Sequence, residues 1–205
     1  MPPAKAECHY HHGDLRNALI QAAERVLVEK GSAGLSLREV AKVAGVSHAA
    51  PYRHFRDKAA LICALAKGGL ERLASAINTA ADSKAHNPEQ KLIEAGVAYV
   101  RLAVENPEIT QLMFSGAIDP QDDKTYLMAA ATAYESLLAI IKEGVERGTF
   151  RQRAPQELAL VAWASLHGMA MLAAAGQFDI ESGDGLALDD LVRSVAINVI
   201  YGLSK

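Results

Sequence analysis

Apolar residues recur at helical spacing along almost the whole chain, and alternating apolar and polar runs are nearly absent. The first periodic segment is expected from about Asp14, a good cap, to Lys30. Its apolar stripe consists of Leu15, Ala18, Leu19, Ala22, Val26 and Leu27. Gly31 and Gly34 are expected to end this helix. Continued along the chain, the pattern predicts an all-α protein of about nine helices.

The stretch 35–61 is expected to form two short helices joined by a tight turn, then the start of a longer helix. Ser36 can cap the first short helix, and Glu39, three residues on, can complete a capping box. Gly45 is expected to end this helix, because glycine readily adopts the left-handed backbone conformation found there.

The second short helix is expected over 47–55, with Ser47 as its cap. Pro51 lies near the end of the first turn, where the first intrahelical hydrogen bond would form. Because proline has no N–H, it disfavours this helix unless the helix starts one residue later. The outward positions are small, polar, aromatic or basic: His48, Ala49, Tyr52, Arg53 and His54. Such a surface suits a recognition helix that lies in a DNA groove. The alternative is an ordinary helical hairpin with a solvated face.

Six further helices are expected. They run from Asp57 past Ala80, from Pro88 to Glu105, from Pro107 to Ser115, from Asp123 to Arg147, from Pro155 to Ala175 and from Leu188 to Gly202. Asn87 and Asn106 each precede a proline and are predicted to cap the helices that begin at Pro88 and Pro107. Gly68 and Gly69 are expected either to kink the first of these helices or to pack against a neighbour. The last helix is expected to bury one face, made of Leu188, Leu191, Val192, Val195 and Val199.

The stretch 158–175 is uncharged and only just long enough to span a bilayer. Its His167, Ser165 and many alanines dilute the hydrophobicity, and no basic flank marks a cytoplasmic side. We therefore interpret it as a helix buried inside the protein or between subunits, and we expect no membrane association.

Charge is distributed unevenly along a chain whose formal net charge is -3. Residues 9–67 hold nine Lys and Arg against five Asp and Glu, whereas residues 68–205 hold eleven against eighteen. The basic surplus coincides with the two short helices, as contact with phosphates requires.

The N-terminal residues contain a Cys/His cluster: Cys8, His9, Tyr10, His11 and His12. The spacing is too crowded for a closed metal site, so no metal is expected. The segment is expected to be an arm, either without contacts or touching the DNA backbone. Cys8 and Cys63 form no disulfide framework, and a signal sequence is lacking, which favours a cytoplasmic protein.

The sequence resembles the tetracycline-repressor (TetR/AcrR) family of regulators. The resemblance rests on Ala44-Gly45-Val46-Ser47, Tyr52-Arg53-His54-Phe55 and Lys58, and it departs at Pro51, where the family more often has Leu or Ile. Trp163, His167 and Gly168 also resemble the signature of the C-terminal subtype called WHG. The resemblance implies a DNA-binding domain over 1–56, then a regulatory and dimerisation domain over 57–205. It also implies a homodimer formed through the last two helices.

Candidate DNA contacts are Ser36, Arg38, Ser47, His48, Ala49, Tyr52, Arg53, His54 and Lys58. Lys58 is unfavourable for the helix dipole in a first turn, so a phosphate contact explains it better. Candidate ligand contacts are Tyr99, Met113, Phe114, Tyr126, Trp163, His167 and Met171. Soft methionines and aromatics suit an adaptable cavity, but they also simply fill cores.

The function expected is a DNA-binding transcriptional regulator, a repressor that binds a palindromic operator as a dimer and is released by a small apolar or amphipathic effector. No cofactor is expected. The rival hypotheses are a helical enzyme and a protein-binding adaptor without DNA affinity. No nucleophile elbow, metal motif or glycine-rich phosphate loop supports the enzyme.

Overall fold

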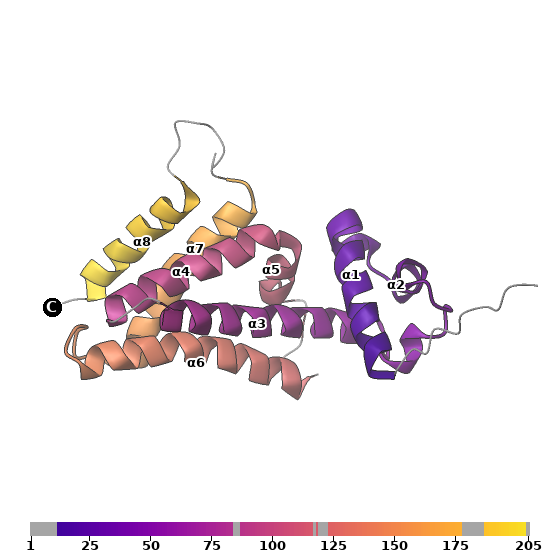
Figure 1. Cartoon of the computed structure of the whole chain (residues 1–205), viewed down its shortest axis with the longest axis horizontal. Coiled ribbons are helices and arrows are strands. Elements are labelled where there is room, and N and C mark those ends of the chain that lie inside the picture. The colour runs from indigo at the N-terminus through magenta and orange to yellow at the C-terminus, as the bar shows by residue number, and fades with distance from the viewer. Residues whose placement is uncertain (1–11, 84–86, 117, 119–122, 178–186, 204–205) are drawn as a thin grey trace, which may run out of the picture. The chain divides into compact units, whose positions relative to one another are not determined.

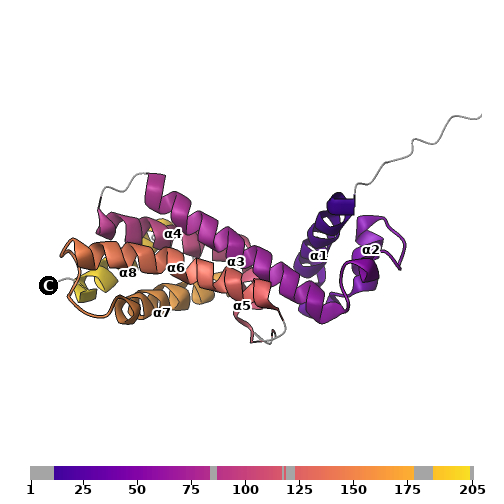
Figure 2. The ribbon, with the colours of Figure 1, turned by 90° about the horizontal axis from the view of Figure 1, so that it is seen from below.

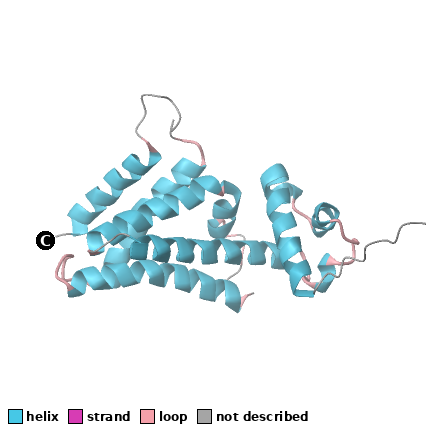
Figure 3. Ribbon diagram, viewed as in Figure 1, coloured by secondary structure: helices cyan, strands magenta, loops and turns pink. Residues whose placement is uncertain are grey.

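The computed structural model describes residues 12–83, 87–116, 118, 123–177 and 187–203, and the regular elements in these ranges are helical (Figure 3). They are α1 (His12–Gly34), α2 (Leu37–Ala44), η1 (Pro51–Arg53), α3 (Lys58–Ser83), α4 (Pro88–Glu105), α5 (Pro107–Phe114), α6 (Lys124–Glu146), α7 (Pro155–Ala174) and α8 (Leu188–Leu203) (Figure 1). The predicted all-α class is confirmed.

The chain divides into two units, Met1–Leu65 (unit 1) and Ala66–Lys205 (unit 2). Unit 1 contains α1, α2, η1 and the first turns of α3, and unit 2 contains the rest of α3 and the helices from α4 to α8.

The first two helices form as their local sequence predicts. The hydroxyl of Ser36 accepts a hydrogen bond from the Glu39 backbone N–H at 3.2 Å, which caps α2. The Glu39 carboxylate accepts from Lys30 Nζ at 2.5 Å and ties the start of α2 to α1, so it does not complete the predicted capping box with Ser36. Gly45 ends α2 with φ 69°, the left-handed conformation expected of it. Gly31, with φ 65°, interrupts α1 directly after Lys30, where the helix was expected to end.

The core of unit 1 is the apolar stripe of α1 packed on α2. Leu19, Ala22 and Val26 have no exposed surface, and Leu27 has 1%. Leu35, Leu37, Val40, Ala41, Phe55 and Leu61 complete this core. The predicted stripe is therefore confirmed, although its first members, Leu15 and Ala18, are only half-buried.

The prediction of an α-helix over 47–55 is wrong. The segment is a turn followed by the three-residue 3₁₀ helix η1, preceded by Ala50 rather than capped by Ser47. An α-helix capped at Ser47 needs an N–H at residue 51 to donate to the Ser47 carbonyl, and Pro51 has none. The Ser47 carbonyl accepts instead from the Ala50 N–H at 3.0 Å, three residues on. The described residues thus hold eight α-helices and one short 3₁₀ helix in place of about nine α-helices.

Helix α4 lies against α5, α6, α7 and α8 in unit 2 (Figures 1 and 2). Its start is as predicted: the Asn87 side chain accepts from the Gln90 N–H at 2.8 Å, ahead of Pro88. Asp57 and Asp123 likewise accept backbone N–H bonds at the starts of α3 and α6. The same expectation is wrong for Asn106, whose side-chain amide donates to the Leu102 carbonyl at the end of α4.

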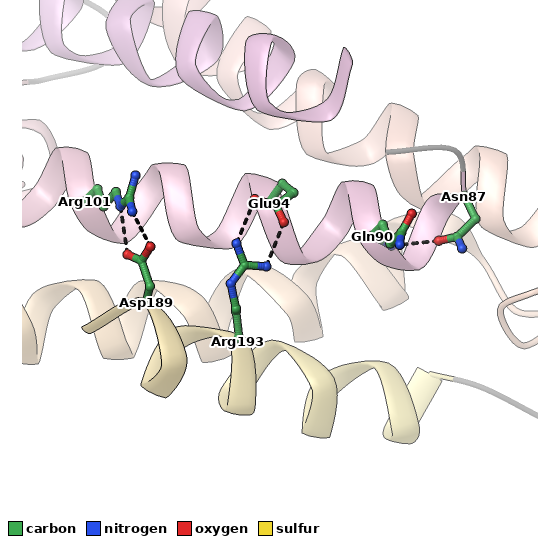
Figure 4. Close-up of polar contacts among 6 residues, drawn as sticks. All are labelled: Asn87, Gln90, Glu94, Arg101, Asp189 and Arg193. Atoms are coloured by element: carbon green, nitrogen blue, oxygen red, sulfur yellow. Dashed lines mark hydrogen bonds and ion pairs between the residues drawn. The ribbon is translucent and has the colours of Figure 1, made fainter. Parts of the chain in front are cut away.

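Two ion pairs join α4 to α8. Arg193 donates to both oxygens of Glu94, at 2.7 and 3.1 Å, and Arg101 makes the equivalent paired contact with Asp189 (Figure 4). The face that α8 buries differs from the predicted one. Only Val192 of the predicted set is fully buried, and its companions there are Ala196, Ile200 and Leu203. Because α8 is apolar on more than one face, its sequence alone does not define the inner one.

Gly69 packs against a neighbouring helix, which was one of the two alternatives for the Gly68–Gly69 pair. A Cβ added to Gly69 would lie 2.5 Å from Met113 Sδ and 2.7 Å from Ile109 Cγ2, both on α5. The absence of a side chain at residue 69 therefore lets α3 approach α5 closely. Around Gly68, no heavy atom lies within 4 Å of an added Cβ.

Among the described residues one helix, α7, is long and apolar enough to cross a membrane by length and composition alone. It packs on α4, α6 and α8, and its buried residues include Leu158, Ala162, Leu166 and Ala170. One face of α7 is therefore buried inside unit 2, whereas Leu160, Val161 and Leu172 are exposed.

Candidate nucleic-acid interface and ligand cavity

Residues 47–54, called the reading segment below, present polar and basic side chains to solvent. Ser47, His48, Ala49 and Arg53 are exposed, and Tyr52 keeps 58% of its surface exposed. His54 is half-buried. The predicted outward positions are therefore accessible, even though the segment is not an α-helix.

The second half of the reading segment is anchored by Pro51 and by Phe55, the residue that follows the segment. Pro51 is buried, and its carbonyl accepts hydrogen bonds from the N–H groups of His54 and Phe55, both at 2.9 Å. The buried ring of Phe55 packs under the guanidinium of Arg16, which lies 5.3 Å from the ring centroid. Burial of residues 51 and 55 fixes the segment on unit 1 while the side chains between them stay free to contact a partner.

The remaining candidate DNA contacts lie near the ends of helices. Arg38 is exposed on the first turn of α2, and the Ser36 hydroxyl is engaged as the cap of that helix. Lys58 is exposed at the start of α3, and its Nζ donates to the Ser32 carbonyl at 2.8 Å. A phosphate contact by Lys58 therefore has to compete with this internal hydrogen bond. The Cys/His cluster lies outside the residues whose side chains the structure describes.

A cavity of about 210 Å³ lies inside unit 2. It is lined by Leu70, Leu73 and Ile77 of α3, Ala95, Gly96 and Tyr99 of α4, Met113 and Phe114 of α5, Tyr126, Ala130, Ala133, Tyr134 and Leu137 of α6, and Trp163 and Leu166 of α7. Side chains from five helices therefore line one mainly apolar cavity.

The structure brings five of the predicted ligand residues together in this lining: Tyr99, Met113, Phe114, Tyr126 and Trp163. His167 and Met171 are not in the lining. The residues that sequence reasoning missed are mostly small or aliphatic, such as Gly96, Ala130 and Ala133. The small residues at helical spacing on α6 could have indicated the cavity, because they leave space beside larger neighbours.

His167 lies outside the lining but contacts two lining residues, Tyr99 and Phe114. Its Nδ1 lies 2.5 Å from the hydroxyl of Tyr99, and its ring meets Phe114 edge-on with centroids 4.5 Å apart. Burial lowers the pKa of His167 and raises the pKa of Tyr99, so both side chains are neutral near pH 7.

No cluster of three or more His, Cys, Asp or Glu side chains suited to a metal ion occurs among the described residues. The cavity lining likewise contains no such side chain. The described residues therefore present an exposed polar and basic segment in unit 1 and an apolar cavity in unit 2 with room for a small molecule.

Both units match known families. Residues 19–65 match the family of bacterial regulatory proteins named after TetR, and residues 92–195 match the tetracycline-repressor-like C-terminal domain. The chain belongs to the TetR family of transcriptional regulators. The predicted class, a helix-turn-helix DNA-binding regulator and not an enzyme, is thereby confirmed.

The chain is also similar to individual known proteins. A Rhodococcus sp. RHA1 protein of unknown function is 35% identical, with 97% of this chain and 100% of that chain covered and a TM-score of 0.84. The TetR-family regulator PfmR from Thermus thermophilus is 23% identical, with 91% and 99% covered and a TM-score of 0.69, and so shows the fold alone. The transcriptional regulator TtgR of Pseudomonas putida is 42% identical over 52 residues, which make up a quarter of this chain and a quarter of TtgR.

Proposed function

We propose that the chain is a cytoplasmic repressor that binds a palindromic operator as a homodimer and leaves it when a small apolar or amphipathic molecule occupies the cavity of unit 2. The observation that carries this proposal is the reading segment, whose polar and basic side chains are exposed although both its anchors are buried. In functional terms we divide the chain into a DNA-binding part, residues 1–56, and a regulatory and dimerising part, residues 57–205.

The DNA contacts divide by chemistry. Arg53 suits the N7 and O6 acceptors of guanine, and His48 and Ala49 lie beside it for other base edges. Ser47, Tyr52 and Lys58 suit phosphates, while His54 suits either. Arg38 and Ser36, at the start of α2, complete the phosphate contacts. Two such surfaces in one dimer would enter successive major grooves about one DNA turn apart.

The dimer contact is proposed on α7 and α8. Large apolar side chains are exposed there: Leu160, Val161 and Leu172 on α7, and Ile197 and Tyr201 on α8. Apolar side chains gathered on two adjacent helices are expected to be covered by another chain. A second copy of this protein, presenting the same two helices, matches the two-fold symmetry of a palindromic site.

An effector can release the protein from DNA only if its affinity differs between two conformations of the dimer. A molecule in the cavity alters DNA binding only if it binds more tightly to the dimer whose reading segments are wrongly spaced. Because the cavity is lined by all the helices from α3 to α7, a shift of any one of them changes its shape.

Operator binding by the purified full-length protein tests the proposal. The DNA upstream of its own gene is titrated across a salt series, and Arg53→Ala is compared with Arg25→Ala, an exposed arginine on α1. We expect affinity to fall steeply with salt, and Arg53→Ala to weaken binding about tenfold or more through loss of a base contact. Arg25→Ala should bind like the unmodified protein. A salt slope near zero, or equal effects of the two substitutions, contradicts the proposal.

A further inference from the structure

The cavity lining contains no lysine, arginine, histidine, aspartate or glutamate. Its polar atoms are limited mainly to tyrosine hydroxyls, of which that of Tyr99 is bonded to His167 and that of Tyr126 donates to the Met113 carbonyl at 3.1 Å. A charged group placed there would lose its water and gain no counter-charge, at a large cost in free energy. The lining therefore selects against ions.

Aromatic residues are concentrated in this lining. Tyr99, Phe114, Tyr126, Tyr134 and Trp163 make up five of its fifteen residues, whereas aromatic residues make up 5% of the chain. A cavity that only had to hold an aliphatic chain could be lined with leucine and isoleucine alone. The concentration of rings points to a ligand that itself carries a ring.

The rings stand tilted to one another around Trp163. The centroid of Phe114 lies 6.5 Å from that of Trp163 at 52°, and that of Tyr134 lies 6.1 Å away at 57°. Aromatic pairs favour edge-to-face and offset contacts. A planar guest can therefore stack on one ring and meet the edge of another.

The volume limits the size of the guest. An apolar cavity of about 150 Å³ is known to hold benzene, so the 210 Å³ present here has room for a ring with a short substituent or a small fused pair. Ala130 and Ala133 contribute this space because their side chains are small, whereas the missing side chain of Gly96 lets Leu166 approach α4.

We infer that the cavity of unit 2 binds a neutral aromatic molecule of one or two rings, in preference to carboxylates and to aliphatic chains of the same size. This inference rests on the proposed function for its regulatory meaning, since it names the chemical class of the effector. The binding itself can be measured without DNA.

Trp163 makes the measurement direct, because it is the single tryptophan of the chain and lines the cavity. Its fluorescence is followed while the full-length protein is titrated with 4-ethylphenol, with the anion 4-methylbenzoate and with 1-octanol, all of similar size. Calorimetry on the same samples confirms each binding constant. We expect 4-ethylphenol to bind saturably and at least about tenfold more tightly than the other two probes.

Two substitutions on α6 test whether this binding takes place in the cavity. Ala133→Phe fills the space, whereas Ala131→Phe adds the same ring at an exposed position of the same helix. We expect Ala133→Phe to lose 4-ethylphenol binding and Ala131→Phe to keep it. If Ala133→Phe does not fold, Ala130→Leu fills part of the same lining with a smaller side chain.

The possible outcomes separate the two proposals. Equal or tighter binding of 4-methylbenzoate or 1-octanol, no saturable binding of 4-ethylphenol, or unaltered binding in the folded cavity-filling variants overturns the inference. Operator binding measured in parallel then shows whether the proposed function still stands. Selective 4-ethylphenol binding by a protein without operator affinity supports the inference and overturns the function.

Discussion

His167 is neutral in the folded protein because burial lowers its pKa below the ordinary 6.5. In the unfolded chain the ring takes up a proton as the pH falls through about 6.5, whereas the folded protein resists this until a lower pH. The unfolded state therefore binds more protons in that window, and stability falls as the pH falls. The titratable group in contact with His167 is Tyr99, whose pKa is raised by burial, so it stays protonated throughout.

We predict that the melting temperature decreases more steeply between about pH 7 and pH 5 in the unmodified protein than in His167→Gln. The glutamine variant loses the hydrogen bond to Tyr99 and is less stable at every pH, but it has no proton to take up at residue 167. Thermal melts across this range check the difference in slope. Parallel pH profiles would show that His167 does not contribute to acid sensitivity.

Helix caps show which features of single residues can be predicted from the sequence and which cannot. Ser36, Gly45 and Asn87 were predicted as helix ends, because a cap depends on a few neighbouring residues. Asn106 has the same local sequence as Asn87, yet its amide turns back to the Leu102 carbonyl. Helix α4 ends directly at Asn106, so its last carbonyls compete for the side chain.

At the scale of helices, the contact of α3 with α5 depends on which of two adjacent glycines is substituted. Gly68→Ala adds a side chain in open space and improves helix propensity, so we expect a gain of about 0.5–1 kcal/mol in stability. Gly69→Ala drives a methyl group into Ile109 and Met113. We expect it to cost about 1–3 kcal/mol through overpacking.

Chemical denaturation of the two single variants measures this contrast, each acting as the control for the other. Since Met113 lines the cavity, Gly69→Ala should also alter ligand binding, whereas Gly68→Ala should not. Equal stabilities of the two variants would show that α3 and α5 can separate without cost.

Helix positions were predictable from periodicity, whereas the inner face of α8 was not. The predicted set included Leu191, Val195 and Val199, which are only half-buried, because apolar residues on two faces of one helix are equivalent in sequence. The aliphatic part of the cavity lining escaped prediction for a related reason. Leu70 and Leu166 lie far apart along the chain, and only packing of α3 and α7 around the same space brings them together.

For the whole molecule, dimerisation is the property that α7 and α8 are expected to control. We predict that Leu160→Glu combined with Tyr201→Glu, at positions 57% and 74% exposed, yields a folded monomer with weakened operator binding. The charges would be buried unpaired in a dimer but solvated in a monomer. Sedimentation analysis and operator titration measure the two effects.

Met128→Glu is the matched control, since Met128 is an apolar side chain on α6 that is 69% exposed. This variant should keep the oligomeric state of the unmodified protein. A dimer that survives the double substitution would place the subunit contact elsewhere.

The shortness of η1 also has a consequence for the range of genes under control. The reading segment contains only a turn and the three residues of η1, so few side chains can discriminate between bases. Each half of an operator then carries little information, and many near-matching sites in a genome become nearly equivalent. Selectivity among promoters would therefore depend on the spacing between half-sites and on protein abundance more than on the letters of each half-site.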